Sequence, residues 1–324
     1  MTSVNTTTTT HPRLLGLGTY RPRRRVDNAE ICRTLDSSPE WIVRRSGIRT
    51  RAFATPDETL VEMAATAAGK ALADAGVAPG DVDELLVATM SDVAGADRDL
   101  PAAVAARAGI PARAAGVGAA CAGFTVALAL AATSVRAGSA RHVLVIGAER
   151  MSDLLDPRDR STAFLFADGA GAVLVGEGQE PGIGPVVWGT DTELIDAITV
   201  RAEPGGPPRL RMQGSPVFRW AVKQLPDVIR AALARSGLAP GDVAAFVPHQ
   251  ANLRIIEAAT QAVGFPPEVA IARDVVDQGN TSAASIPLAL DRLRAEGAVA
   301  SGDVCLLAGF GSGLTYAALA ARMP

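Results

Sequence analysis

A cysteine at position 121 is the residue of this chain best placed to act as a nucleophile. It follows Gly118, Ala119 and Ala120 and precedes an apolar helical run, within the segment GVGAACAGFTVALAL that spans Gly116–Leu130. A cysteine after a tight turn and at a helix N-terminus is expected to have a lowered thiol pKa and backbone N–H donors for an oxyanion. A structural cysteine buried among small residues fits the same segment, so the segment alone leaves both interpretations open.

Two further polar groups follow buried or turn-forming segments in the second half of the chain. His249 lies in AFVPHQANLR, at the end of the apolar run 244–247 and after Pro248. Asn280 lies in GNTSAASIPLAL, just before a predicted helix. Asn, Thr or Ser before a helix is often only an N-cap. We expect Thr281 or Ser282 to provide that cap and to leave Asn280 free for another role.

An internal repeat explains why these residues should meet. The stretches 70–91 and 230–251 share APGDV, at residues 78–82 and 239–243, with an offset of 161 (239 − 78). The apolar runs 143–147 and 304–308 keep that offset. In each copy a helix, a Gly/Pro turn and a buried strand follow one another, so the sequence predicts a duplicated α/β fold with pseudo-twofold symmetry.

The repeat also predicts where the functional groups lie. His249 corresponds to Ala88 at a strand end, and Ser282 corresponds to Cys121 by the same offset (282 − 161). Sites in α/β sheets form at strand ends, so we expect Cys121, His249 and Asn280 to converge near the pseudo-twofold axis.

Composition excludes several function classes. The net charge is −3, and no basic cluster is interleaved with aromatics, so we expect no nucleic-acid partner. The only cysteines are Cys32, Cys121 and Cys305, a poor disulfide framework that indicates a reducing cytoplasm. The N-terminus has no apolar run, and we expect neither a signal peptide nor a membrane span. No metal-ligand spacing or phosphate-binding glycine motif is present in the sequence, and we expect no metal.

Four segments together resemble β-ketoacyl-acyl carrier protein synthase III, including its polyketide-priming members. They are AACAGFTVAL, VPHQANLRII, GNTSAASIP and EWIVRRSGIRTR, the last at residues 40–51. The resemblance extends from about residue 13 to residue 322 and implies the duplicated five-layered αβαβα thiolase-like fold, normally a homodimer. We expect a disordered tail at residues 1–11, an N-terminal half at 12–183 and a C-terminal half at 184–324.

The resemblance implies a role for each candidate. Cys121 would take an acyl group from an acyl-CoA primer, and a malonyl-acyl carrier protein would then lose CO₂. His249 and Asn280 would stabilise the resulting enolate, and the backbone N–H groups of Cys121 and Ser312 would form an oxyanion hole. No resident cofactor is implied. An acyl transfer without decarboxylation, to a carrier or hydroxyl acceptor, is the alternative reaction of this fold.

The resemblance further implies a set of residues that hold CoA and its pantetheine arm: Trp41, Arg45, Arg160, Phe218 and Asn252. Trp41 and Arg160 would sandwich the adenine. Arg219 and Arg254 would dock the carrier protein, although a solvated surface arginine is the simpler interpretation of each. Leu100 stands where many relatives have an aromatic that closes the acyl pocket from across the dimer interface, so it is a candidate gate.

Overall fold

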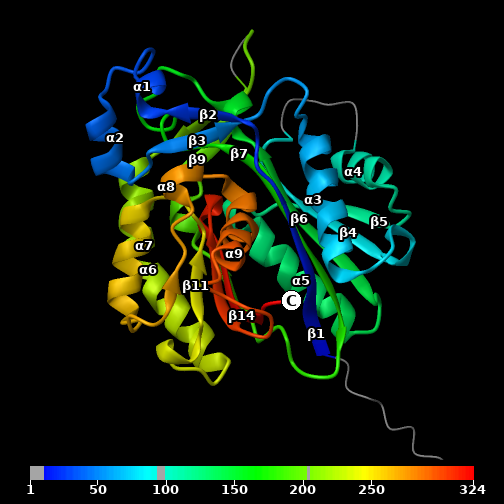
Figure 1. The fold of residues 1–324 in the computed structure, drawn as a ribbon. Coiled ribbons are helices and arrows are strands. Elements are labelled where there is room, and N and C mark those ends of the chain that lie inside the picture. Colours follow the sequence, from blue (N-terminus) through cyan, green and yellow to red (C-terminus); the bar gives the residue numbers. More distant parts are fainter. Residues whose placement is uncertain (1–10, 93–98, 203–204) are drawn as a thin grey trace, which may run out of the picture.

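Two five-stranded mixed sheets form the frame of the structure, one from each half of the chain (Figure 1). The computed structural model describes residues 11–92, 99–202 and 205–324. The predicted tail 1–11 lies outside these residues except for His11, which begins the first strand. The first sheet has the order β1 (His11–Tyr20), β7 (Asp168–Gly178), β6 (His142–Arg150), β4 (Glu84–Ala88), β5 (Arg113–Val117).

The second sheet repeats this order. In the sense that matches the first sheet, its strands run β8 (Val187–Thr190), β14 (Thr315–Arg322), β13 (Val304–Phe310), β11 (Ala245–Pro248), β12 (Ala270–Ile271). In each sheet the central strand pairs in parallel with the next strand on one side and antiparallel on the other. The shared APGDV segments form the matching turns η1 (Pro79–Asp81) and η5 (Pro240–Asp242). The predicted duplication is therefore confirmed.

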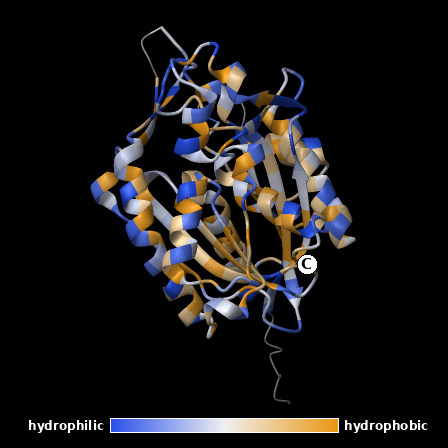
Figure 2. Ribbon diagram, turned by 60° about the vertical axis from the view of Figure 1, so that its left-hand side comes forward, coloured by the Kyte–Doolittle hydropathy of each residue, from blue (hydrophilic) through white to orange (hydrophobic). Residues whose placement is uncertain are grey.

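Helices complete five layers. Helices α3 (Leu60–Ala75) and α4 (Leu100–Ala108) cover the outer face of the first sheet, and α6 (Gly214–Arg235) and α7 (Leu253–Val263) cover that of the second. Helices α5 (Gly123–Arg136) and α9 (Ser285–Ala295) lie between the sheets. Helix α5 is buried on nearly all sides, as its Ala, Val and Leu composition requires. The outer helices carry both hydrophilic and hydrophobic residues along their length (Figure 2).

Short elements cover the ends of the two sheets. They are β2 (Arg24–Asp27), α1 (Asn28–Ile31), α2 (Pro39–Ser46), β3 (Thr50–Phe53), η3 (Met151–Leu154), η4 (Thr192–Leu194), β9 (Ile198–Arg201), β10 (Arg209–Met212) and α8 (Val275–Gln278). Among the described residues, no helix combines the length and apolarity needed to cross a membrane.

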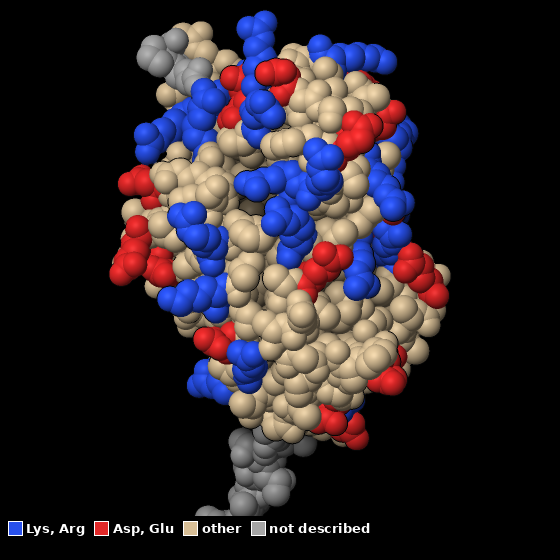
Figure 3. Space-filling view, turned by 90° about the vertical axis from the view of Figure 1, so that its left-hand side faces the viewer, with Lys and Arg blue, Asp and Glu red and all other residues tan. Residues whose placement is uncertain are grey.

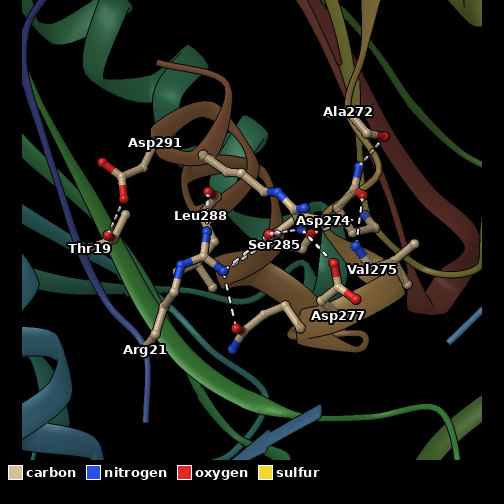
Figure 4. A network of polar contacts seen from close by, with 12 residues as sticks. Thr19, Arg21, Ala272, Asp274, Val275, Asp277, Ser285, Leu288 and Asp291 are labelled. Atoms are coloured by element: carbon tan, nitrogen blue, oxygen red, sulfur yellow. Dashed lines mark hydrogen bonds and ion pairs between the residues drawn. The ribbon is translucent and has the colours of Figure 1, made fainter. Parts of the chain in front are cut away.

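A buried ionic network ties the first half to the segment that precedes Asn280 (Figure 4). Arg21 donates to the Asp274 carboxylate at 3.0 and 3.1 Å and to the Leu288 carbonyl at 2.8 Å. Asp274 is only 3% exposed, so its charge needs this partner. Through these bonds Arg21, the residue after β1, holds both α8 and α9, the two helices that flank Asn280.

Candidate active site

Cys121 lies in a tight turn between β5 and α5. It is the middle residue of η2 (Ala120–Ala122), and Ala120 before it has a left-handed φ of 45°. The side chain of Cys121 is 5% exposed. Burial raises the pKa of the Cys121 thiol to about 12. The predicted lowering of this pKa is therefore wrong for the free protein, because desolvation of a thiolate here outweighs the helix N-terminus.

The turn that carries Cys121 packs against a strand end of the other half. A Cβ on Gly309 of β13 would collide with Thr125, and a Cβ on Gly311 would lie 2.7 Å from the backbone nitrogen of Cys121. These glycines let β13 approach the nucleophile closely. The mirrored contact exists in the first half, where a Cβ on Gly147 of β6 would collide with the Ala283 carbonyl.

That mirrored turn corrects one predicted equivalence. η6 (Ser282–Ala284) is the counterpart of η2, and Ser282 has a left-handed φ of 46° that matches Ala120. In the structure Ser282 therefore corresponds to Ala120, and Ala283 corresponds to Cys121. The offset is 162 at this turn (282 − 120), one more than in the APGDV segments.

His249 follows the end of β11 and is 2% exposed. Burial lowers the pKa of His249 to about 3, so the imidazole is neutral near pH 7. Its Nδ1 lies 2.7 Å from Ser285 Oγ, and Ser285 Oγ accepts a hydrogen bond from the Gln250 backbone N–H at 3.2 Å. We therefore assign the Ser285 hydroxyl as the donor to Nδ1. This assignment puts the His249 proton on Nε2.

Asn280 is held by its backbone and by its own side-chain oxygen. Its N–H donates to the Leu165 carbonyl at 2.9 Å, and its carbonyl accepts from Ala167 N–H at 2.8 Å. Its Oδ1 accepts from Ser282 N–H at 2.9 Å. The prediction that Thr281 or Ser282 provides the cap is therefore wrong. Because the amide oxygen is the capping group, the Nδ2 amide hydrogens are the ones left to donate into the site.

One cavity of about 580 Å³ joins these groups to the surface. It is lined by Cys121, His249 and Asn280 and by all five predicted CoA contacts, Trp41, Arg45, Arg160, Phe218 and Asn252. Figure 3 shows Lys and Arg side chains gathered around a hollow on the face that carries α2, α6 and α7. This arrangement suits an elongated anionic molecule whose far end reaches the buried thiol.

The predicted adenine and pantetheine residues interact with one another along the mouth. The Arg160 guanidinium lies 5.1 Å from the centre of the Trp41 ring, and Arg254 lies 4.9 Å from that of Phe218. The Asn252 amide donates to the Arg45 carbonyl at 3.2 Å and thereby joins α7 to α2. Each aromatic face is thus covered by an arginine that an incoming flat ring would have to displace.

Three predicted residues are not among those that line the cavity. Ser312 donates through its hydroxyl to the Ile198 carbonyl at 2.7 Å, whereas its neighbour Gly311 faces Cys121. Arg219 is exposed on α6. Leu100 is 6% exposed and packs in the core of the first half, and its role as a gate across a dimer interface stays a prediction.

Two buried polar residues that do not line the cavity, Ser285 and Glu149, were not predicted. Ser285 begins α9 and orients His249, and its signal in the sequence is a fourth polar residue in the otherwise small, apolar GNTSAAS segment. Glu149 is fully buried at the end of β6 beside η6. The feature of the sequence that could have revealed Glu149 is an acidic residue near the end of a buried apolar strand.

Comparisons with known proteins show the family of this chain. The family model described as 3-Oxoacyl-[acyl-carrier-protein (ACP)] synthase III matches residues 116–192, and that of its C-terminal part matches residues 233–323. Beta-ketoacyl-[acyl-carrier-protein] synthase III 4 of Streptomyces coelicolor is 49% identical over 96% of this chain and 98% of its own length. The mycobacterial synthase III of Mycobacterium marinum is 46% identical over 96% of this chain and 95% of its own.

The chain belongs to the β-ketoacyl-acyl carrier protein synthase III family.

Solved structures of synthase III proteins share the whole fold. The priming β-ketosynthase of the R1128 polyketide pathway is 46% identical, with a TM-score of 0.95 over 100% of this chain and 99% of that one. The synthase III of Pseudomonas aeruginosa PAO1 is 37% identical, with a TM-score of 0.90 over 97% and 98%. The five-layered thiolase-like fold and the assignment as an acyltransferase enzyme are therefore confirmed.

A methyl group at Gly311 should disturb the nucleophile of this synthase III. We expect Gly311→Ala to lower the free energy of unfolding by about 1–3 kcal/mol, because the new Cβ would press on the Cys121 backbone. Chemical denaturation measures this change. The matched control is Gly80→Ala, where a Cβ meets no atom within 4 Å and the change should stay within about 0.5 kcal/mol. Equal effects at the two positions would contradict the close approach.

Proposed function

We propose that this chain joins an acyl-CoA primer to malonyl-acyl carrier protein in a decarboxylative condensation, as an initiating step of fatty-acid or type II polyketide synthesis. Cys121 Sγ attacks the primer thioester, a new thioester forms on Cys121, and CoA leaves. The malonyl group then loses CO₂, and the enolate attacks the Cys121 thioester. The product is a β-ketoacyl carrier protein, and the Cys121 thiolate is released.

The observation that carries the proposal is the hydrogen bonding of His249 and Asn280, which line the same cavity as Cys121. Neutral His249 presents Nε2–H because Ser285 occupies Nδ1, and Asn280 presents its amide hydrogens because Oδ1 is occupied. Both are fixed neutral donors along one cavity. Such donors stabilise the negative oxygen of an enolate without competing with it for a proton. Hydrolysis would instead need a base to activate water, and neutral His249 with Nε2 protonated is not one.

Product analysis tests the proposal. Purified protein, a panel of acyl-CoA primers and malonyl-acyl carrier protein should yield β-ketoacyl carrier protein with one CO₂ for each product. Transfer of the acyl group without CO₂ release would favour the non-decarboxylating alternative. No product with any primer of a panel of straight, branched and aromatic acyl groups would overturn the proposal.

The aromatic ring of Trp41 in the lining of the cavity supports an acyl-CoA as the acyl donor. We expect Trp41→Ala to raise the KM for acyl-CoA about tenfold, because stacking of a base on an aromatic ring contributes about 1–3 kcal/mol. Steady-state kinetics with acyl-CoA measure this effect. Acyl-pantetheine, which lacks the adenine, should be used equally by both proteins. Val43→Ala is the control, because Val43 lies exposed on the same helix but does not line the cavity. An unchanged KM for Trp41→Ala would place the adenine elsewhere.

We also propose that the carrier protein docks at Arg219 and Arg254.

We propose in addition that the protein is a homodimer. Edge strand β5 is largely exposed, and Leu130 on the neighbouring helix α5 is 39% exposed. An exposed edge strand beside an apolar side chain favours pairing with a second copy. Light scattering after size-exclusion chromatography should give twice the protomer mass.

A further inference from the structure

Gln250, the residue after His249, has a side chain that is 1% exposed and does not line the cavity. Its Nε2 donates to the Pro248 carbonyl at 2.8 Å and to the Ala272 carbonyl at 3.3 Å. Its Oε1 accepts from the Val275 N–H at 3.1 Å. Both amide hydrogens and the amide oxygen are therefore bound inside the protein, a set of bonds that glutamine alone offers among side chains of this length.

The Gln250 amide joins two segments at the point where the sheet ends. Strand β11 pairs with β12 as far as the bond from the Ala272 N–H to the Phe246 carbonyl, at 3.0 Å. Past Ala272 (Figure 4), the described hydrogen bonds between the His249 segment and the chain that leads to Asn280 are those of the Gln250 side chain. One buried side chain thus sets the spacing of these two segments.

The position of His249 depends on Gln250 in two ways. The backbone N–H of Gln250 donates to Ser285 Oγ at 3.2 Å and so turns the hydroxyl hydrogen towards His249 Nδ1, 2.7 Å away. The side chain of Gln250 binds the carbonyl of Pro248, the residue before His249. A displacement of Gln250 would therefore move the imidazole and also disturb the hydroxyl that fixes its tautomer.

The other end of the Gln250 amide holds the helix that leads to Asn280. Val275 begins α8, and its carbonyl accepts from the Gly279 N–H at 3.1 Å, where that helix ends. Asn280 comes next and is bound through its backbone to Leu165. Because α8 has only 4 residues, a displacement of Val275 reaches Asn280 with little chain in between to absorb it.

We propose that Gln250 is a positioning residue for decarboxylation, whose buried amide fixes the distance between the His249 donor and the Asn280 donor. Both donors must reach one thioester oxygen, so an error in their separation weakens their hydrogen bonds to it. Gln250 itself does not line the cavity and acts only through these two residues. This inference rests on the condensation proposed above, in which both donors serve the malonyl thioester.

Gln250→Met tests the proposal, because methionine has a similar length but lacks the amide donors and acceptor. Protein is acylated on Cys121 beforehand, and CO₂ release from malonyl-acyl carrier protein is followed. We expect decarboxylation to slow by about 10–10²-fold, the effect of a misplacement of about 1 Å. Acylation of Cys121 by acyl-CoA should stay within about threefold of the wild-type rate, because it does not use the two donors. Unchanged decarboxylation, or an equal slowing of both steps, overturns the proposal.

Asn28→Leu is the matched control for the loss of a buried amide. Asn28 is 5% exposed, and its amide donates to the Ile48 carbonyl at 2.8 Å and accepts from Arg51 at 2.6 Å. These bonds join neither His249 nor Asn280. Both variants should unfold at lower denaturant concentration than wild type, but only Gln250→Met should lose decarboxylation selectively. An equal loss of decarboxylation in the two variants also overturns the proposal.

Gln250→Glu provides the test if Gln250→Met does not fold. A neutral glutamic acid keeps one donor and an acceptor for Val275, whereas its carboxylate would repel the Pro248 and Ala272 carbonyls. Burial raises the pKa of a carboxyl group. Decarboxylation relative to wild type should therefore be best preserved at acidic pH and fall as the pH rises through that pKa. A relative rate that is the same at every pH overturns the proposal.

The ¹⁵N spectrum of labelled histidine separates this inference from the proposed function. His249 is one of only three histidines in the chain, and its ring signals report its tautomer and hydrogen bonding without any reaction. They should change in Gln250→Met or Gln250→Glu and stay as in wild type in Asn28→Leu. Unchanged His249 signals in the Gln250 variants overturn the positioning role. If wild type releases no CO₂ from malonyl-acyl carrier protein, the proposed function fails instead.

Discussion

Cys121→Ser should abolish condensation, with kcat/KM reduced by at least about three orders of magnitude. A serine hydroxyl in the same buried turn ionises far less readily than a thiol, and oxygen is the weaker nucleophile towards a thioester. The oxyanion donors and the CoA contacts remain in this variant, so acyl-CoA should still bind with an unchanged dissociation constant. Product formation by mass spectrometry and binding by calorimetry measure the two effects separately.

Cys305→Ser is the matched control for this prediction. Cys305 is 1% exposed on β13, and burial raises the pKa of its thiol to about 12, as it does for Cys121. The same atom exchange at an equally buried position should leave kcat/KM within about twofold and affect only stability. Residual condensation in Cys121→Ser at a tenth of the wild-type rate would contradict a covalent role for Cys121.

His249→Ala and Asn280→Ala should each slow decarboxylation by about 10²–10³-fold, the usual cost of one donor to a developing oxyanion. Both variants should still acylate Cys121 at close to the wild-type rate, because the donors that they lack serve the malonyl thioester. The test uses protein acylated on Cys121 beforehand and follows CO₂ release from malonyl-acyl carrier protein.

The pH dependence gives the second prediction an independent check. Because the pKa of His249 is lowered to about 3, its imidazole keeps one protonation state from near neutral pH down to that region. The decarboxylation rate of pre-acylated protein should therefore show no loss with a midpoint near 6.5, the ordinary histidine value. A loss centred there would mean that His249 acts as a titrating base.

The sequence predicts the fold and the three central residues because both depend on local pattern and repetition. The APGDV repeat and the two apolar runs indicate matching strands, and the structure has them in the same order in both sheets. Cys121, His249 and Asn280 follow strand ends or turns, and they line one cavity. In α/β folds such positions lie at the same sheet edge, so spacing along the chain is informative.

The properties that the sequence does not predict arise from burial. The helix N-terminus at Cys121 suggested a low thiol pKa, whereas the surrounding layers raise it. The cap at Asn280 was assigned to its neighbours, because sequence does not reveal which oxygen reaches an N–H group. A one-residue shift at η6 hid the pairing of Ser282 with Ala120. Glu149 was missed because its partners come from segments far apart along the chain.

The most direct test of the central claim follows one labelled acyl group through a single turnover. Protein is acylated with a ¹³C-labelled acyl-CoA, freed of CoA and mixed with malonyl-acyl carrier protein. We predict that the label leaves Cys121 and reaches the carrier protein as a β-ketoacyl group, with one CO₂ for each label. A label that is bound to another residue, or that reaches the carrier without CO₂, would contradict condensation through a Cys121 thioester.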